Sequence, residues 1–309
     1  MHGETAEYRK FLLEGGYDVI MCYAAQNWAT DLVFEAVDGI KAKKVLVPCG
    51  YSGLRLPIYK EYFRTLPANL AKFDALVYMS TNYQDVIFGR ENGVSDREIY
   101  IPNGAGEEFL VPPTGFRERF NIRTKYLLLN VSNHTGMKGH DFVIDALRMM
   151  KRKDVTLAII GESLGGMRRF WRGCMKSCLA KSLLDRRIRL FTSLPREWVV
   201  GAYAEADLFL FGSRVECAPL VMYESFASGT PFITTPVGNV ADHSDVVRIV
   251  RTPREMADEA GHLLDDNVAR TRVAESGRKL WQYDHNWNAI SGRYEELYLS
   301  LLAGKGIPR

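Results

Sequence analysis

The sequence lacks several patterns that mark common nucleotide-binding enzymes. No Gly-x-Gly-x-x-Gly follows an expected strand, and no Walker loop is present. Because dinucleotide oxidoreductases and P-loop enzymes cradle phosphates on such glycine-rich loops, neither class is supported. No apolar run reaches the roughly 18 residues of a membrane-spanning helix, and the N-terminus has no signal-peptide core. The formal net charge of +3 is too small to indicate nucleic-acid binding.

Cysteine is also scarce. The five cysteines are scattered along the chain: Cys22, Cys49, Cys174, Cys178 and Cys217. Only Cys174 and Cys178 lie close together, and no second pair completes a zinc-binding set. We therefore expect free thiols, no bound metal, no cofactor and a cytoplasmic protein, since the cytoplasm keeps cysteines reduced.

What the sequence does contain is a regular alternation of strand-like and helix-like segments. Strands are expected at residues 18–23, 44–48, 75–80, 98–101, 126–132, 155–160, 187–191, 206–211, 232–235 and 247–250. Helices are expected at residues 8–14, 30–40, 58–66, 83–91, 141–150, 197–206, 220–227, 253–264, 268–281 and 286–302. This alternation predicts parallel α/β sheets. The Pro-Pro-Thr-Gly break at 112–115 divides the chain into domains 1–112 and 113–309.

The chain is organised around residues 213–243. Pro219 suits the first position of a helix and Gly229 its end, which places Glu216 in the preceding loop and Glu224 on the helix. A helix N-terminus attracts phosphate through its free N–H groups, whereas carboxylates accept strong hydrogen bonds from sugar hydroxyls. A nucleotide sugar combines a diphosphate with hydroxylated ends and fits both features. Two solvated surface acids are the alternative.

These residues also carry a family resemblance. Glu216 and Glu224 form a Glu-x7-Glu motif, preceded by Ser-Arg-Val and followed by Ala-Ser-Gly-Thr-Pro at 227–231. The chain thereby resembles the retaining glycosyltransferases of the GT-B fold, of the glycosyltransferase family 4 type. Residues 73–80 and the Ile-Pro-Asn-Gly at 101–104 resemble the segments that close the family's first domain. The resemblance implies two Rossmann-like domains, with the last helix crossing back to the first.

The resemblance assigns roles in donor binding. It implies that Glu224 holds the ribose hydroxyls, that Glu216 orients the transferred sugar, and that Lys138 neutralises the leaving diphosphate together with N–H groups around Leu220 and Val221. It places further donor-binding positions at Asn133, Gly139, Gly161, Arg214, Ala218 and Pro219. The implied family needs no metal, and the Asp-x-Asp of metal-dependent glycosyltransferases does not occur.

The sequence departs from the family pattern at two places where the resemblance implies donor binding. Cys217-Ala218-Pro219 stands where the family usually has Gly-Phe-Gly, and Pro219 removes one backbone donor. Asn133 stands where the family has arginine, which removes a charge and a bidentate fork. Weaker donor binding or a different geometry is expected. His134 and His140 flank the loop at 133–139 and are expected to be polar loop residues rather than catalysts.

The first domain differs from the family pattern more than the second domain does. The family normally opens with a strand and a Gly-rich loop roughly a hundred residues before such a point, and neither precedes Met1 in this sequence. We therefore expect an incomplete domain, through truncation, natural loss or supply by a second chain. Met21 and Tyr23 stand near the position where the family often carries histidine. Gln26, Asn27 and Trp28 follow the first strand at the end where open α/β sheets bind ligands. They are candidates for an acceptor site, although simple packing suits Trp28 better.

Residues 167–189 carry eight basic side chains against one acid, with apolar residues interleaved near helical spacing. Such a segment suits a solvated outer helix, peripheral contact with an anionic membrane, or contact with a polyanionic glycan. In the last helix, Trp287 and Tyr294 are expected to pack.

The sequence thus predicts a metal-independent hexosyltransferase that moves a sugar with retention from a nucleoside-diphosphate donor to a hydroxyl of a glycan, glycolipid or polysaccharide. The alternative is a non-catalytic or partner-dependent nucleotide-sugar-binding subunit, suggested by the incomplete first domain and by Asn133.

Overall fold

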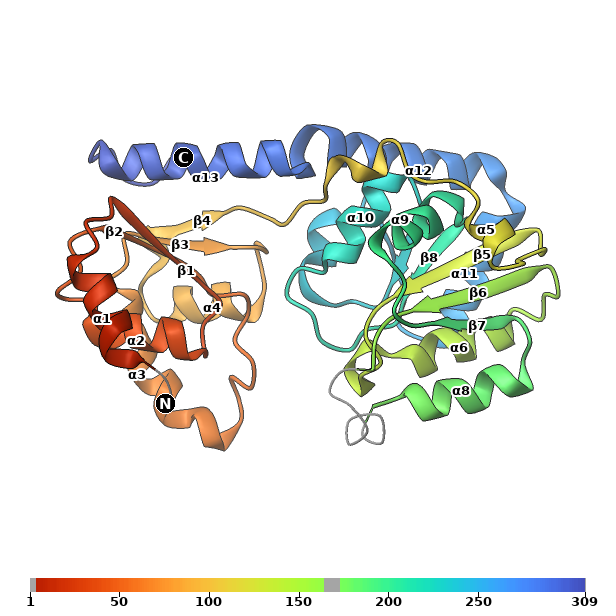
Figure 1. Ribbon diagram of the computed structural model, residues 1–309, viewed down its shortest axis with the longest axis horizontal. Helices are drawn as coiled ribbons and strands as arrows, with labels where there is room; N and C mark the ends of the chain where they lie inside the picture. The colour runs from red at the N-terminus through yellow and green to blue at the C-terminus, as the bar shows by residue number, and fades with distance from the viewer. Residues whose placement is uncertain (1–3, 164–172, 309) are drawn as a thin grey trace. The chain divides into compact units, whose positions relative to one another are not determined.

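The computed structural model describes residues 4–163 and 173–308, and the chain divides into two compact units (Figure 1). The first unit contains Met1–Pro102 together with Ile290–Arg309, and the second contains Asn103–Ala289. Each unit alternates strands with helices around a parallel sheet. This confirms the predicted α/β class with two parallel sheets.

The first unit holds a four-stranded parallel sheet in the order β1-β2-β3-β4. Its strands are β1 (Val19–Tyr23), β2 (Lys43–Val47), β3 (Ala75–Tyr78) and β4 (Glu98–Tyr100). Its helices are α1 (Thr5–Glu14), α2 (Trp28–Ala36), α3 (Lys60–Leu70) and α4 (Gln84–Glu91), and α13 (Trp287–Leu302) contributes its later residues. Strands that follow one another in the sequence are also neighbours in the sheet, so the strand order does not reverse within the described part of this sheet.

The core of the first unit forms where α2 and α3 cover the sheet. Val33 on α2 and Leu66 on α3 are almost wholly buried, as are Leu46 on β2 and Leu76 on β3. These apolar runs are continuous rather than alternating, as expected for a parallel sheet covered by helices.

The second unit holds a six-stranded parallel sheet in the order β10-β9-β8-β5-β6-β7. Its strands are β5 (Tyr126–Val131), β6 (Val155–Ile160), β7 (Ile188–Phe191), β8 (Leu208–Phe211), β9 (Phe232–Thr234) and β10 (Arg248–Ile249). Its helices are α5 (Phe116–Arg119), α6 (His140–Met149), α8 (Met175–Leu184), α9 (Arg196–Glu205), α10 (Leu220–Ser228), α11 (Pro253–Asp265) and α12 (Asn267–Leu280). A π-helical turn, Trp281–His285, leads from α12 towards α13.

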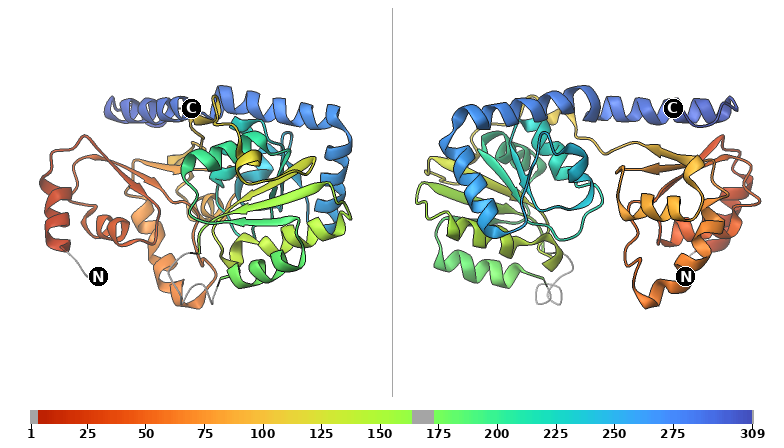
Figure 2. Two further views of the ribbon diagram at one scale, coloured as in Figure 1. Left: turned by 45° about the vertical axis from the view of Figure 1, so that its right-hand side comes forward. Right: turned by 180° about the vertical axis from the view of Figure 1, so that it is seen from behind.

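Helices cover both faces of this sheet (Figures 1 and 2). One buried cluster joins α9 and α10 to the sheet and includes Tyr203, Phe209 and Phe226. The cluster on the other face joins α6, α8 and α11 and includes Leu147 and Met256. Because helices cover both faces of this sheet, a ligand is expected at the carboxyl ends of its strands.

The structure divides the chain earlier than the Pro-Pro-Thr-Gly break suggested. The stretch just before that break belongs to the second unit through buried hydrogen bonds. Ala105 N–H donates to His285 O at 2.9 Å, and Trp281 Nε1 donates to Ala105 O at 3.0 Å. Phe109 is fully buried, with its ring centroid 5.4 Å from that of Tyr203. Because of these contacts, the second unit begins at Asn103, before the proline-rich break.

Helix starts differ in detail from the expectations. Asp141 was expected to be the first residue of α6, but the helix begins at His140 and its N-cap is Gly139, in the left-handed conformation (φ 61°). Asp141 lies in the first turn and pairs with Arg214 instead. Pro219 is the N-cap of α10 rather than its first residue, with Gly229 after the last turn as expected.

Two of the expected packing tryptophans are largely exposed. Trp28 is 60% exposed and contacts the Tyr8 ring edge-on, and Trp287 is 45% exposed. Both begin helices, where the helix end leaves one side open to solvent. Tyr294 is half-buried and lies against Tyr298.

The basic segment at 167–189 is not one amphipathic helix. Residues 164–172 lie outside the described part of the chain, and α8 ends at Leu184 before β7 begins. Arg187 is drawn inwards, because its guanidinium pairs with Asp185 and donates to the carbonyls of Leu147 and Arg152. A uniform basic face for a membrane therefore does not form over the described residues.

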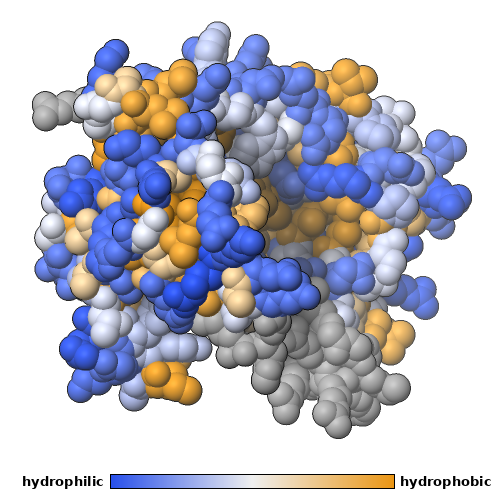
Figure 3. Space-filling view, turned by 60° about the vertical axis from the view of Figure 1, so that its left-hand side comes forward, coloured by the Kyte–Doolittle hydropathy of each residue, from blue (hydrophilic) through white to orange (hydrophobic). Residues whose placement is uncertain are grey.

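No described helix combines the length and apolarity needed to cross a bilayer. On the face drawn in Figure 3, hydrophilic side chains predominate and the hydrophobic residues appear as separate patches. The most exposed apolar side chains on α8 are Leu183 and Leu184.

Candidate active site

The site is built where the order of strands in the second sheet reverses. β5 pairs with β6 on one side and with β8 on the other, so the chain winds outwards in both directions from this pair. In open parallel sheets, ligands bind beyond the carboxyl ends of the strands at such a point. The two loops that leave β5 and β8 at this edge carry Lys138 and Glu216.

The loop after β5 turns sharply to present Lys138. Its last residue, Gly139, has φ 61°, and a Cβ there would meet the backbone of Gly212, at the end of β8. Glycine is therefore required both for the left-handed conformation and for the close approach of the two loops. This contact positions the Lys138 ammonium beside the loop after β8.

The loop after β8 directs Glu216 towards that ammonium. Lys138 Nζ lies 2.7 Å from Glu216 Oε1, and Ser213 Oγ donates to the same oxygen at 2.6 Å. The Glu216 side chain is only 12% exposed, so the ion pair is partly shielded from water. Among residues 4–163 and 173–308, Glu216 Oε2 accepts no hydrogen bond, which leaves one carboxylate oxygen for a ligand hydroxyl.

The N-terminus of α10 follows directly. Helix α10 starts at Leu220 after Pro219, and the Ala218 carbonyl accepts a hydrogen bond from Asn103 Nδ2 at 2.9 Å. The first N–H groups of a helix, here at Leu220 and Val221, have no acceptors within the helix. They provide partial positive charge next to the Lys138–Glu216 pair, which suits a phosphate.

Glu224, one turn into α10, is held by two residues that the sequence reasoning did not single out. Tyr203 OH donates to Glu224 Oε2, and Arg196 Nη2 lies beside Oε1, each at 2.7 Å. Arg196 also reaches Glu108 at 2.9 Å. Burial, followed by the nearby Glu224 charge, raises the pKa of Tyr203 well above its usual value, so the phenol stays a neutral donor.

Three further predicted positions support the loops. The Asn133 Oδ1 accepts a hydrogen bond from Glu162 N–H at 3.3 Å, so this side chain joins the loops after β5 and β6. Gly161 lies so close to the Ser132 backbone that a Cβ would collide with it. Arg214 pairs with Asp141 at 2.6 Å and donates to Gly136 O at 3.0 Å. These contacts tie the loops after β5, β6 and β8 to one another.

The acceptor candidates belong to the first unit and have structural partners there. Asn27 is the N-cap of α2: its Oδ1 accepts from Ala29 and Thr30 N–H, and its Nδ2 donates to Ala24 O. Gln26 has φ 58° and donates from Nε2 to Ser52 O at 2.8 Å. Trp28 remains exposed. The Asn27 side chain therefore uses both its oxygen and its nitrogen in hydrogen bonds at the start of α2.

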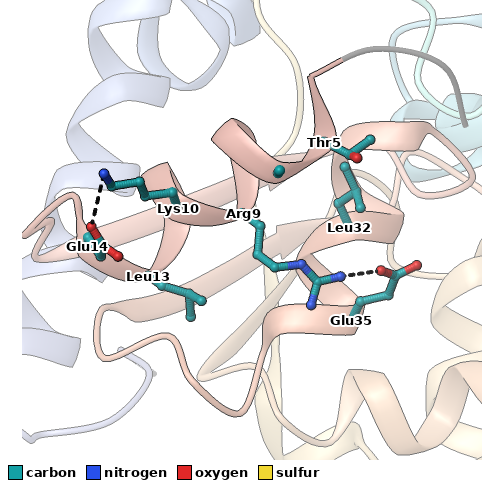
Figure 4. A pocket seen from close by; sticks show the side chains of 8 residues that line it. Thr5, Arg9, Lys10, Leu13, Glu14, Leu32 and Glu35 are labelled. Atoms are coloured by element: carbon teal, nitrogen blue, oxygen red, sulfur yellow. Dashed lines mark hydrogen bonds and ion pairs between the residues drawn. The ribbon is translucent and has the colours of Figure 1, made fainter.

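A separate hollow lies on the first unit between α1 and α2 (Figure 4). Its volume is about 710 Å³, and Arg9, Lys10 and Leu13 line it together with Glu14 and Glu35. Arg9 pairs with Glu35 at 2.7 Å and Lys10 with Glu14 at 3.8 Å, so its charges neutralise one another.

The sequence signal for Arg196 and Tyr203 was weak. Both lie on α9, more than 20 residues before Glu224, and only packing of α9 against α10 brings them to it. Ser213 was noticed as part of a motif without a role, and the structure places its hydroxyl on Glu216.

Residues 114–280, more than half of the chain, match the family model described as glycosyl transferases group 1. A D-inositol 3-phosphate glycosyltransferase of Corynebacterium urealyticum is 30% identical over 175 residues, which cover 53% of this chain and 41% of that protein. A glycogen synthase of Mycobacterium tuberculosis is 26% identical over 189 residues, which cover 59% and 44%. The chain thus spans less than half the length of these two relatives.

Solved structures share the fold. Sucrose-phosphate synthase of Thermosynechococcus elongatus superposes with a TM-score of 0.82 at 19% identity, covering 97% of this chain and 77% of that chain. Anabaena HepE, crystallised in complex with UDP, gives 0.82 at 18% identity, covering 96% and 82%. At such identity the likeness shows the fold, which is of the GT-B type. The match over residues 114–280 shows the family, and the shared fold agrees with it: this protein belongs to the glycosyl transferases group 1 family.

Proposed function

We propose that this protein is a retaining glycosyltransferase that moves a sugar from a nucleoside-diphosphate donor to a hydroxyl acceptor. The observation that carries the proposal is the Lys138–Glu216 pair at 2.7 Å, beyond the ends of β5 and β8 and beside the N-terminus of α10. One ammonium, several free N–H groups and a carboxylate with an available oxygen match a diphosphate joined to a sugar.

In this proposal the bond between the sugar's anomeric carbon and the diphosphate oxygen breaks, and the electron pair leaves on the diphosphate. Lys138 and the N–H groups of Leu220 and Val221 stabilise that charge, which is the kind of electrostatic term that usually dominates catalysis. The acceptor oxygen bonds to the anomeric carbon on the same face and passes its proton to the departing diphosphate oxygen. Glu216 Oε2 holds a hydroxyl of the transferred sugar during the reaction.

Glu224 holds the ribose of the donor in this scheme. Its two oxygens are engaged by Arg196 and Tyr203, but a carboxylate oxygen accepts more than one hydrogen bond. Tyr203 fixes the orientation from inside, and the ribose hydroxyls bind from the open side. Since Lys138 and the first N–H groups of α10 supply positive charge at the diphosphate, the transfer in this scheme needs no divalent metal there.

The donor class is a uridine or other nucleoside diphosphate hexose. HepE of Anabaena was crystallised with UDP and with UDP-glucose, and glycogen synthases are among the relatives. These proteins support a hexose donor here. The acceptor is a hydroxyl of a glycan, a glycolipid or a polysaccharide.

A second candidate is a donor-binding subunit that works through another chain. Asn133 favours it, because its side chain brings no charge and is bonded to Glu162 within the loops. Among the structural neighbours is a GtfA/B complex, with a TM-score of 0.69. This candidate predicts donor binding without turnover.

A binding and turnover experiment separates the two. The protein is titrated with UDP, GDP and their hexose derivatives by calorimetry, and nucleotide release is then followed with and without glycan acceptors, with and without added Mg²⁺. If the protein is an enzyme, the wild type releases nucleotide from the donor, and Lys138→Met lowers the rate of this release on the order of 100-fold. The exposed Lys153→Met, outside the site, is the matched control. Binding without release supports the subunit, and the absence of binding contradicts both.

A further inference from the structure

Four metal-ligating side chains converge behind the loop that carries Lys138. One ligand atom from each of His134, His140, Cys174 and Cys178 lies within 4.8 Å of every other. His134, His140 and Cys178 are 2% exposed or less, and Cys174 is half-buried. The sequence reading had found only the cysteine pair, because the two histidines lie far from it in the chain.

The fold explains how two distant pairs meet. His134 lies in the loop after β5, and His140 is the first residue of α6, so they stand at the two ends of one tight turn. Cys174 is the N-cap of α8 and Cys178 lies one turn into it, so both thiols point to one side of that helix. Helices α6 and α8 cover the same face of the sheet (Figure 1), which brings the two pairs together.

The distances suit a tetrahedral ion. Cys174 Sγ lies 3.1 Å from His140 Nδ1 and 3.7 Å from His134 Nδ1, and the two imidazole centroids are 4.5 Å apart. Tetrahedral bonds of zinc to sulfur and to histidine nitrogen place the ligand atoms roughly 3.3–3.8 Å apart, so Cys174 Sγ needs only a small shift away from His140 Nδ1 to bind the ion. The spacings His-x5-His and Cys-x3-Cys also fall within those of structural zinc sites.

The surrounding hydrogen bonds orient His140 as a ligand. Asn130 Nδ2 donates to Leu210 O at 2.7 Å, so its Oδ1 is the acceptor for Ser132 Oγ at 2.9 Å. Ser132 has then used its proton, and it accepts from His140 Nε2 at 2.8 Å. The proton of His140 is thereby held on Nε2, and Nδ1 turns a lone pair towards Cys174. Metal-bound histidines are fixed by such outer contacts.

His134 has an unmet requirement of its own. Its Nε2 is buried and has no hydrogen-bond partner among the described residues. Because Nδ1 is the nitrogen that faces Cys174, a metal bound there would orient the ring but would leave Nε2 without a partner.

We propose that His134, His140, Cys174 and Cys178 bind one zinc ion. Soft thiolates with imidazoles select zinc, and four protein ligands close the coordination sphere, as in structural rather than catalytic sites. The ion clamps both ends of the turn at 134–140 to α8. Because Lys138 lies inside this turn, the clamp also fixes the ammonium that faces Glu216.

The test is the metal content of the intact protein, produced in zinc-supplemented medium and passed over a desalting column. We expect one zinc per chain, and a cobalt-substituted form with the intense d–d absorption of a tetrahedral thiolate site. His134→Ala and Cys178→Ser should lose the zinc, whereas His134→Cys should keep it because the ligand number is unchanged. Cys49→Ser, which removes a half-buried cysteine outside the cluster, is the control that keeps full occupancy.

Stability gives a second readout that does not depend on transferase activity. A strong chelator should lower the melting temperature of the wild type by at least about 4 °C, with no further effect on any ligand variant that folds. Substoichiometric zinc in the wild type would overturn the proposal. So would zinc that survives in His134→Ala and His140→Ala, or a disulfide between Cys174 and Cys178 in the freshly purified protein.

Discussion

Lys138 and Glu216, which are 78 residues apart in the sequence, form an ion pair of 2.7 Å at the edge where β5 and β8 end. The same carboxylate oxygen also accepts the Ser213 hydroxyl, so Oε1 has two donors, whereas Oε2 has none among the residues that the structure describes. In the free protein, Glu216 therefore competes with any diphosphate for the Lys138 ammonium. Binding and catalysis should respond differently when this pair is broken.

Glu216→Gln should separate the two effects. Losing the carboxylate frees Lys138, so UDP should bind as tightly as to the wild type or more tightly, while sugar transfer should fall on the order of 100-fold. Calorimetry with UDP and the transfer rate at saturating donor provide the two measurements. Equal loss of both quantities would show that the pair is merely structural.

The pair should also behave as a unit. Lys138→Met should weaken UDP binding as well as transfer, and the double variant should cost less than the sum of the two single losses, because each single change already breaks the ion pair. A double-mutant cycle on the transfer rate measures this. Strict additivity would contradict a functional coupling between Lys138 and Glu216.

Tyr203→Phe should weaken donor binding without unfolding the protein. The ring keeps its packing against Phe109 and Phe209, but Glu224 loses its buried hydroxyl donor. We expect roughly a tenfold rise in Kd for UDP, the effect of about one hydrogen bond to a charged group. The exposed Tyr283→Phe serves as the control. An unchanged Kd would exclude Glu224 from the donor contacts.

Gly139→Ala should destabilise the second unit. Alanine is strained at φ 61°, and its Cβ would collide with the backbone of Gly212. A loss of about 2 kcal/mol or more in unfolding free energy is expected. Gly136→Ala is the matched control in the same turn, because its Cβ would meet nothing within 4 Å. Equal unfolding midpoints in urea for the two variants would show that the loops do not depend on this close approach.

The buried His243 predicts a dependence of stability on pH. Burial lowers its pKa below the ordinary value, an effect opposed by the nearby Asp242 and Asp245 charges. As pH falls through about 6.5, the unfolded chain takes up a proton that the folded chain refuses, so the free energy of unfolding decreases. His243→Gln should reduce this loss, measured by urea unfolding between pH 7.5 and about 5.5.

His262→Gln, which removes an exposed histidine on α11, is the control and should keep the wild-type slope. A His243→Gln variant with that same slope would place the acid sensitivity elsewhere.

Much of the fold could be predicted from the sequence, because apolar runs such as Leu127–Leu129 and Leu208–Phe211 specify buried strands locally. Lys138 and Glu216 were also accessible, since each lies in the loop after an expected strand and within a segment that resembles the family pattern. Arg196 and Tyr203 were not, because their role depends on how α9 packs against α10. The meeting of His134 and His140 with Cys174 and Cys178 was not accessible either, since nothing local in the sequence links the two histidines to α8.

The stretch from Asn103 to Phe109 has a practical consequence for dissecting the molecule. The second unit is one uninterrupted piece of chain, Asn103–Ala289, so it is suited to separate expression. A version that begins at Pro113, next to where the family match starts, would leave the Trp281 indole without its acceptor and strip Phe109 from the Tyr203 ring. The support of Glu224 thus begins upstream of the region by which the family is recognised, and trimming to that region would first loosen the contacts that hold Glu224.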